Sequence, residues 1–338
     1  MKCTILALTD CPLSSVAGPL EILSLANSLV PPNKAIDLSI LGESDLMITC
    51  ANNLKLAAHN TINNVKQSDL IIIGAIGKPS RTTFHIMPET LDWIRQQHQQ
   101  GAQIVSICTG AFVLAATGLL DNKRATTHWA CERTFKTLFP QVLLNTNALI
   151  TQDGSLLCSG GASAYQDMTL LLVRQYYGDQ IAHQCAKAIL IDLDRQQQSR
   201  YAQFQPSRQH NDSLVHNVQD WLEKNVTTQF TIASLATQVH LSERQFKRRF
   251  KLAIGDSPLI YIQALRIEIA KHSLENSNEN IAAIGHKSGY EDTRFFRQLF
   301  KRHTGLSPSE YRSKCSFPTL QMVKRNFSTV NYFTQYET

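Results

Sequence analysis

The sequence has no apolar run long enough to cross a bilayer, and it does not open with a basic segment followed by an apolar one. Its eight cysteines are scattered, and no two of them form a Cys-x-x-Cys pair. Scattered cysteines without a secretory signal predict reduced thiols in a cytoplasmic protein without a membrane partner. His128 and Cys131 have a spacing that zinc ligands use, but no second ligand pair stands nearby. We therefore expect neither a metal nor another cofactor.

The length and the charge distribution predict two domains with different partners. A chain of 338 residues is long for one domain of about 150 residues. Residues 1–205 hold 15 Lys and Arg against 15 Asp and Glu, whereas residues 206–315 hold 16 against 11. Because the net positive charge lies in the C-terminal half, this half is the one expected to bind a polyanion.

The stretch from Phe230 to Arg312 contains two short helical units, each ending in a basic helix. In the first unit, Ser242 followed by Gln245 forms a capping box that starts a helix. Phe246 and Phe250 then share one face of this helix, and the opposite face is basic. A short helix with charge on one side suits the DNA major groove, where guanine edges and phosphates attract Arg and Lys. One such helix alone would usually be a solvated face, but two capped ones favour DNA binding.

The second unit repeats this plan. Gly289 supplies positive φ in its turn, and Asp292 is the expected N-cap of the helix that follows. Gly305 is expected to end that helix. Between the two units, Ser257-Pro258 begins a longer helix that runs through Leu274. Four side chains of the second basic helix are expected to face inward: Phe295, Phe296, Leu299 and Phe300.

Three motifs of this region, in this order and spacing, carry a resemblance to a known family. They are Gly289-Tyr290-Glu291-Asp292, Phe296-Arg297-Gln298-Leu299-Phe300-Lys301 and Gly305-Leu306-Ser307-Pro308. The region resembles the DNA-binding domain of AraC-family transcription regulators. The resemblance implies an all-α domain with two helix-turn-helix units, set about one turn of double-stranded DNA apart by the linking helix. His240 stands in the first turn where Gly is common, which predicts a different turn shape there.

The resemblance also implies which side chains contact DNA. In the first basic helix, Lys251 lies on the same face as the base-facing residues. Carried over by position, the base-facing residues are Arg244, Lys247, Arg248, Thr293, Arg294, Arg297 and Gln298, and Lys251 completes the expected DNA-binding set.

The N-terminal half alternates between expected strands and helices. The strands are Thr4–Leu8, Ile36–Leu41, Asp69–Gly74, Gln103–Ile107, Leu143–Ile150 and Ser155–Cys158. The helices are Val16–Val30, Pro88–Gln100, Ala111–Leu120 and Ala164–Tyr177. This alternation predicts an α/β fold with a flavodoxin-like parallel sheet and helices on both faces. The expected domain limits are 1–194 for this domain, 195–212 for a polar linker, 213–315 for the DNA-binding domain and 316–338 for a tail.

Cys108 stands at a sharp junction between an expected strand and an expected helix. Backbone N–H groups at a helix N-terminus favour a thiolate there. The carboxyl end of a central strand is also where open α/β sheets bind ligands. The motif Cys108-Thr109-Gly110-Ala111 occurs with Gly118-Leu119-Leu120-Asp121 and Gly160-Gly161-Ala162. Together they resemble the class I glutamine amidotransferase-like superfamily, in its PfpI-type branch. Regulators are known that place such a domain before an AraC-type module.

The resemblance leaves the chemistry of Cys108 open. Enzymes of this superfamily place a carboxylate from the start of the first helix beside the cysteine, and the matching position here is Ser15. Serine cannot act as an ionised acid or base near neutral pH. Glu21 lies further along the helix. His128 could reach the site, but the sequence shows no partner that would orient it for catalysis. Alternatively, His128 packs as a core histidine beside Trp129. We therefore assign no catalytic residue. The expected ligand-binding residues are Cys108, Thr109, Ser15, Glu21 and His128. Two alternative roles for Cys108 are a redox-responsive thiol and a catalytic nucleophile.

These interpretations together predict a transcription regulator controlled by a small molecule. By resemblance, the effector would be an amino acid or an amine-like metabolite, and the N-terminal domain would form a homodimer. One alternative is a cysteine-dependent hydratase or hydrolase of the PfpI type, joined to a DNA-binding module. Another is an architectural DNA-binding protein that senses nothing. The sequence leaves activator and repressor roles open.

Overall fold

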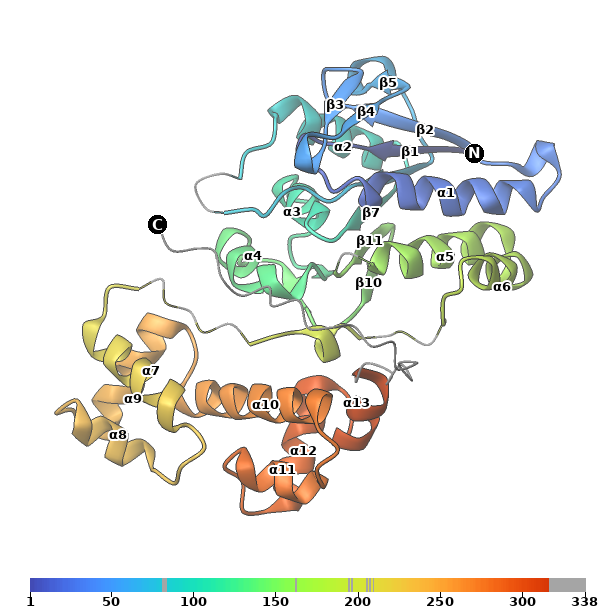
Figure 1. Ribbon diagram of the computed structural model, residues 1–338. Coiled ribbons are helices and arrows are strands. Elements are labelled where there is room, and N and C mark those ends of the chain that lie inside the picture. Colours follow the sequence, from blue (N-terminus) through green and yellow to red (C-terminus); the bar gives the residue numbers. More distant parts are fainter. Residues whose placement is uncertain are drawn as a thin grey trace, which may run out of the picture. The chain divides into compact units, whose positions relative to one another are not determined.

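The computed structural model describes residues 1–315 except 81–83, 162, 194, 196, 205, 207 and 209. The chain divides into two compact units, Met1–Gln203 and the part from Phe204 onward. Figure 1 shows that the first is an α/β unit and that the second is helical. The predicted tail 316–338 lies outside the described residues. No helix among the described residues is long and apolar enough to cross a bilayer.

The first unit is built on a seven-stranded sheet in the order β10-β11-β7-β6-β1-β2-β5. Neighbouring strands are parallel except for the hairpin of β10 and β11 at one edge. This confirms the predicted α/β class and adds one antiparallel edge strand. The strands are β1 (Lys2–Leu6), β2 (Asp37–Gly42), β5 (Asn60–Thr61), β6 (Leu70–Ile73), β7 (Gln103–Ile107), β10 (Ile150–Asp153) and β11 (Leu156–Ser159). Small two-stranded sheets pair β3 (Met47–Thr49) with β4 (Lys55–Ala57) and β8 (Arg124–Ala125) with β9 (Leu143–Leu144).

Helices cover both faces of the sheet, as predicted. Side chains alternate along a strand, so Ile5 and Ile72 belong to one core while Leu6 and Ile73 belong to the other. The first core is closed by α1 (Ser14–Ser28), α5 (Ala164–Tyr177) and α6 (Asp179–Ala188). The second is closed by α2 (Pro88–Gln99), α3 (Gly110–Ala116) and α4 (Glu132–Leu138).

Several details of the first unit differ from the prediction. The structure adds the helices α4 and α6 and the short strands β3, β4, β5 and β8, and the predicted strand Leu143–Ile150 is divided between β9 and β10. The helix expected over Ala111–Leu120 ends early, at Ala116, because Gly118 adopts a positive φ of 79° that breaks the helix.

The second unit consists of seven described helices around two cores that share α10. One core joins Leu222, Leu235 and Phe250 to Tyr261 of α10. The other joins Ile284 and Phe300 to the C-terminal half of α10. This confirms an all-α unit with two helix-turn-helix units. The helices are α7 (Ser213–Asn225), α8 (Ile232–Gln238), α9 (Glu243–Ile254), α10 (Pro258–Asn276), α11 (Ile281–Lys287), α12 (Thr293–Thr304) and α13 (Pro308–Cys315).

Candidate DNA-binding surface and effector site

Helix α9 presents the predicted basic face. The capping box is present, with the Ser242 amide donating to Gln245 Oε1 (3.0 Å) and the Gln245 amide to Ser242 Oγ (3.4 Å). Phe246 and Phe250 are buried, which turns the opposite face outward. Arg249 instead donates to Asp212 Oδ2 (2.6 Å), which lowers the pKa of that carboxyl, and it is therefore held off the basic face. The exposed basic residues are Arg244, Lys247, Arg248 and Lys251.

Helix α12 presents the second reading face. Asp292 is its N-cap, with Oδ1 accepting from the amides of Arg294 (2.7 Å) and Phe295 (3.2 Å). Gly305 ends the helix with a φ of 78°. Among the predicted DNA-binding residues, Thr293 is half-buried, and three are exposed: Arg294, Arg297 and Gln298.

The inward orientation predicted for Phe295 is wrong, because this side chain is 47% exposed. Phe296, Leu299 and Phe300 already fill the inner face, and position 295 lies at its edge. The Phe295 ring lies 6.1 Å from that of Tyr290.

The two helix-turn-helix turns have the same backbone. His240 adopts a φ of 55°, in the same region as the 90° of Gly289. Leu241 N donates to Ala236 O just as Tyr290 N donates to Gly285 O, both at 3.0 Å. The different turn shape predicted from His240 is therefore wrong, since histidine takes the conformation that glycine takes in the second turn.

Arg266 of α10 connects the two helix-turn-helix units. Its guanidinium donates to the carbonyls of Val226 (2.7 Å) and Thr228 (3.0 Å), ahead of α8, and of Gly289 (2.9 Å), ahead of α12. Its central carbon also lies 5.5 Å from the ring centroids of Phe230 and Tyr290. One side chain thus fixes the loop before α8 and the turn before α12 to the linking helix. Sequence reasoning missed it, although an arginine between Leu265 and Ile267 in an otherwise apolar stretch was an available signal.

In the first unit, Cys108 forms the predicted sharp turn between β7 and α3. Its φ is 56°, an uncommon conformation for a residue with a side chain, and it is only 8% exposed. Gly110 starts α3 directly against the end of β6. A Cβ there would lie 2.6 Å from Gly74 O and 2.7 Å from Ile73 O.

Thr109 and Ser15 lie at the same edge of the sheet and fix the loop that follows β6. Thr109 Oγ1 donates to Ile76 O (2.6 Å) and accepts from Ile76 N (2.9 Å). Ser15 Oγ donates to Pro12 O (2.7 Å) and accepts from Ala75 N (3.0 Å). These hydroxyls therefore shape the site, and each retains capacity for one further hydrogen bond.

His128 follows Thr127 in the chain, and Thr127 Oγ1 donates to Cys108 O (2.9 Å). The Nδ1 atom of His128 accepts a hydrogen bond from Ala130 N (3.1 Å). Burial lowers the pKa of His128, which favours the neutral ring. Glu21 is different, because it is exposed on α1 whereas Ser15 belongs to the buried face of that helix. The structure thus brings Cys108, Thr109 and Ser15 to the same end of the sheet, connects His128 to them only through Thr127, and leaves Glu21 exposed.

The Cys108 thiol is not activated. Burial raises its pKa to about 11, and this outweighs the lowering by the Thr109 amide and hydroxyl, while Cys131 raises it further. Among the described residues, neither a carboxylate nor a histidine contributes to this shift. The position of Cys108 at a helix N-terminus suggested a lowered pKa. This prediction is wrong in sign, since desolvation of the thiol is the larger effect.

A separate cavity of about 490 Å³ lies elsewhere in the first unit, between β10, α5, α6 and Arg195. Asp167 and Arg195 form a largely buried ion pair in its wall, with 3.1 Å between Oδ2 and Nη2. Its volume would suit a small metabolite. Its lining residues are Ile150, Asp167, Leu170, Leu171, Arg174, Asp179, Ala182, His183, Leu193 and Arg195, and none of them is a predicted effector residue.

Comparison with known proteins gives matches in both units. A helix-turn-helix domain model matches residues 235–314, and the model of the DJ-1/PfpI family matches residues 15–175. The transcriptional regulator CdhR of Pseudomonas aeruginosa is 26% identical over 269 residues, 79% of this chain and 78% of that protein. The regulator GbdR of the same species is 25% identical over 311 residues, 91% of this chain and 83% of that protein.

Two further likenesses cover shorter parts of the chain. An isonitrile hydratase of Pseudomonas putida is 41% identical over 90 residues, which is 27% of this chain and 38% of the enzyme. A crystal structure of a transcriptional regulator protein from Vibrio parahaemolyticus has a TM-score of 0.52 at 26% identity, covering 56% of this chain and 98% of that one.

These matches define a protein that joins a DJ-1/PfpI domain to a helix-turn-helix domain of the AraC type. The chain belongs to the DNA-binding transcription regulators of this architecture. The relatives that match over most of the chain are regulators, which supports a regulatory role and not an enzymatic one.

Proposed function

We propose that this regulator reads one DNA duplex with α9 and α12 and that a small metabolite bound beside Cys108 controls the reading. The observation that carries the DNA part is the pair of exposed polar and basic faces fixed to α10 through Arg266. Base contacts by Arg248 and Arg297, together with phosphate contacts by their neighbours, fit the major groove. We also propose that the first unit forms the homodimer.

The effector part is supported by the geometry at the end of β7. Cys108, Thr109 and Ser15 lie at the carboxyl ends of the central strands, where this class of fold binds ligands, and Thr127 connects this end of the sheet to His128. An un-ionised thiol there serves as part of the wall. To control DNA binding, the metabolite has to bind two states of the protein unequally. Amino acids and quaternary amines are the classes to test first.

The test uses the full chain and a duplex selected by it from a random library. Each natural amino acid, glycine betaine and choline is added singly, and thermal melting and duplex affinity are measured. A ligand at 100 times its Kd stabilises by about 2.7 kcal/mol. We expect one class to stabilise the protein and shift its affinity for the duplex.

Two variants locate the effector. His128→Ala should abolish the response, while Leu171→Phe, which narrows the cavity at α5 and α6, should keep it. The reverse pattern would place the effector in that cavity. Melting and affinity that no compound changes would favour an architectural protein without a sensor.

The second candidate is a cysteine-dependent hydratase or hydrolase, favoured by the likeness to isonitrile hydratase over 90 residues. Against it, Ser15 stands where such enzymes carry the carboxylate, and burial raises the pKa of Cys108 to about 11. At pH 8 a thiol with that pKa is thiolate in roughly one molecule in a thousand.

Labelling with iodoacetamide separates the two candidates. Because only the thiolate reacts, we expect slow alkylation of Cys108 at pH 7, rising about tenfold per pH unit up to pH 10. Mass spectrometry of the Cys108 peptide measures the rate, with the unfolded protein as control. Fast alkylation at pH 7 that is flat above pH 8 would indicate an activated nucleophile.

A further inference from the structure

The segment predicted as a polar linker, 195–212, is bound at both of its ends. At the first end, Arg195 donates to Ser163 Oγ (3.0 Å) besides its ion pair with Asp167. Gln197 pairs with Ala148 in an antiparallel bridge. These contacts dock the start of the segment onto the first unit.

Gln198 makes the largest number of these contacts and is 2% exposed. Its Nε2 donates to Thr127 O (2.8 Å), Thr126 Oγ1 (3.2 Å) and Ala148 O (3.3 Å). Its Oε1 accepts from Gly161 N (3.1 Å). A buried amide with both ends satisfied is a specific anchor, because displacing it leaves buried partners without hydrogen bonds.

The Gln198 amide packs against Gly160 and leaves no space for a side chain there. A Cβ at position 160 would lie 2.5 to 2.7 Å from three atoms of the Gln198 amide. At Gly161 the nearest atom would be His128 Cδ2 at 3.5 Å, an ordinary contact distance. Only the first of these two neighbouring glycines is therefore required by Gln198.

Thr127 connects the anchor to the effector site. Its carbonyl accepts from Gln198 Nε2, and its hydroxyl donates to the carbonyl of Cys108. Thr127 is fully buried, and His128 is the next residue. Gln198 is thus two hydrogen bonds away from the turn at Cys108.

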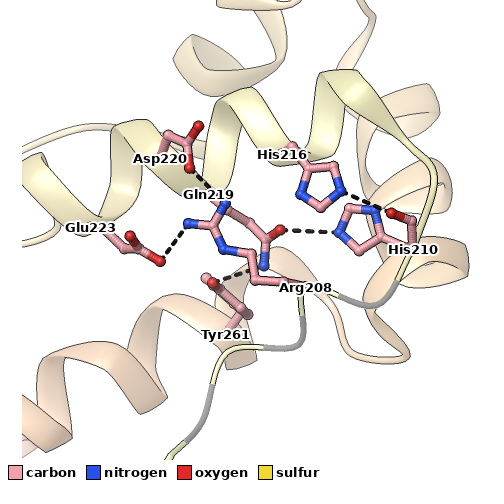
Figure 2. A network of polar contacts seen from close by, with 7 residues as sticks. All are labelled: Arg208, His210, His216, Gln219, Asp220, Glu223 and Tyr261. Atoms are coloured by element: carbon pink, nitrogen blue, oxygen red, sulfur yellow. Dashed lines mark hydrogen bonds and ion pairs between the residues drawn. The ribbon is translucent and has the colours of Figure 1, made fainter. Parts of the chain in front are cut away.

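The other end of the segment is bound to the second unit, as Figure 2 shows. Arg208 reaches both Asp220 Oδ1 and Glu223 Oε1 at 2.6 Å. The His210 ring stacks on His216 with 4.0 Å between centroids. Figure 2 also shows the bond from His210 Nε2 to the amide of Gln219 (3.0 Å), which in turn donates to Tyr261 Oη (3.0 Å).

Because both ends are bound, the free tether is short. It runs from Tyr201 to Phe204, whose ring packs on Tyr261 of the second unit with 5.3 Å between centroids, and it spans at most about 10 Å when fully extended. Each further residue that leaves the first unit adds about 3.5 Å of reach. The reach of a tether sets the effective concentration at which a linked module finds its site.

We propose that Gln198 is the residue that couples the Cys108 site to the DNA-binding unit. Occupancy of that site and docking of Gln198 influence one another through Thr127, and docking sets the length of the tether. This rests on the proposed function, because it concerns regulation through the same site. Coupling of this kind is reciprocal, so disturbing the turn at Cys108 loosens the segment and loosening the segment disturbs the turn.

Hydrogen exchange of the full chain, without any metabolite, tests the coupling. Gly160→Ala is expected to speed exchange of residues 197–201 roughly tenfold or more by expelling the Gln198 amide. Gly161→Ala is the matched control and should leave it unchanged. Gln198→Ala should reproduce the effect without altering the loop, which separates undocking from general unfolding.

Thr127→Val tests whether the hydrogen bond between Thr127 and Cys108 affects the docking of Gln198. It removes the hydroxyl bonded to Cys108 O and keeps the carbonyl that Gln198 uses. We expect faster exchange at 197–201 by roughly tenfold, restored by Thr127→Ser. Unchanged exchange there would overturn the coupling, even if a metabolite regulates DNA binding. Conversely, faster exchange in Thr127→Val would support it even if no tested metabolite binds, so the two proposals fail separately.

Discussion

Arg266→Met is expected to lower the free energy of unfolding of the second unit by about 3 kcal/mol or more. The guanidinium donates to three backbone carbonyls, at 2.7, 2.9 and 3.0 Å, and methionine fills similar space without any donor. Affinity for the selected duplex should fall roughly 100-fold, which corresponds to about 2.7 kcal/mol. The reason is geometric, because the loop that leads from Val226 into the first helix-turn-helix unit and the turn at Gly289 in the second unit lose their common attachment.

Urea unfolding monitored by exchange or by the fluorescence of Trp221 measures the first effect, and titration of the duplex measures the second. Arg297→Ala is the matched control, since it removes an exposed arginine. It should leave unfolding unchanged, relax sequence choice and cost roughly 1–3 kcal/mol of binding if the side chain pairs with guanine. Arg266→Lys should not rescue, because one ammonium cannot reproduce a planar fork of donors. If Arg266→Met melts like the wild type and binds like Arg297→Ala, the connecting role is refuted.

In the second unit, the helix ends could be predicted from neighbouring residues, whereas contacts between residues far apart in the sequence could not. The caps at Ser242 and Asp292, the start of α10 at Pro258 and the end of α12 at Gly305 each depend on residues within one helical turn. Arg266 could not be found that way, since its partners lie 40 and 23 residues away. The orientation of Phe295 was predicted wrongly for another reason. Its apolar side chain suggests burial, but the sequence does not show that other side chains already fill the inner face of α12.

In the first unit, the alternation of strands and helices was sufficient for the fold class and for the turn at Cys108. The polar composition around Gln198 looks like a linker, and only the fold shows that its amide has buried partners. The sign of the Cys108 pKa shift also needs the fold, because helix-terminal amides lower it and burial raises it. Burial depends on the whole sheet, which short-range patterns do not describe.

Gly110→Ala is expected to have a large effect on the first unit, and two principles disagree about its sign. Helix propensity alone would stabilise α3 by about 1 kcal/mol, because alanine is the better helix former. The added Cβ would instead lie 2.6 and 2.7 Å from the carbonyl oxygens of Gly74 and Ile73, both backbone atoms at the end of a central strand. Neither can rotate away, so the strand end or α3 has to shift.

The steric effect is expected to win, with a net loss of about 3 kcal/mol in the stability of the first unit. Urea unfolding monitored by the buried Trp93 measures it, and Cys108→Ala is the control that keeps Gly110. The same variant should weaken any response to an effector, since displacing α3 moves Thr109 away from Ile76. Equal or greater stability of Gly110→Ala would mean that the end of β6 yields easily. In that case the turn at Cys108 is not held as a fixed wall, and a preformed effector site there would be excluded.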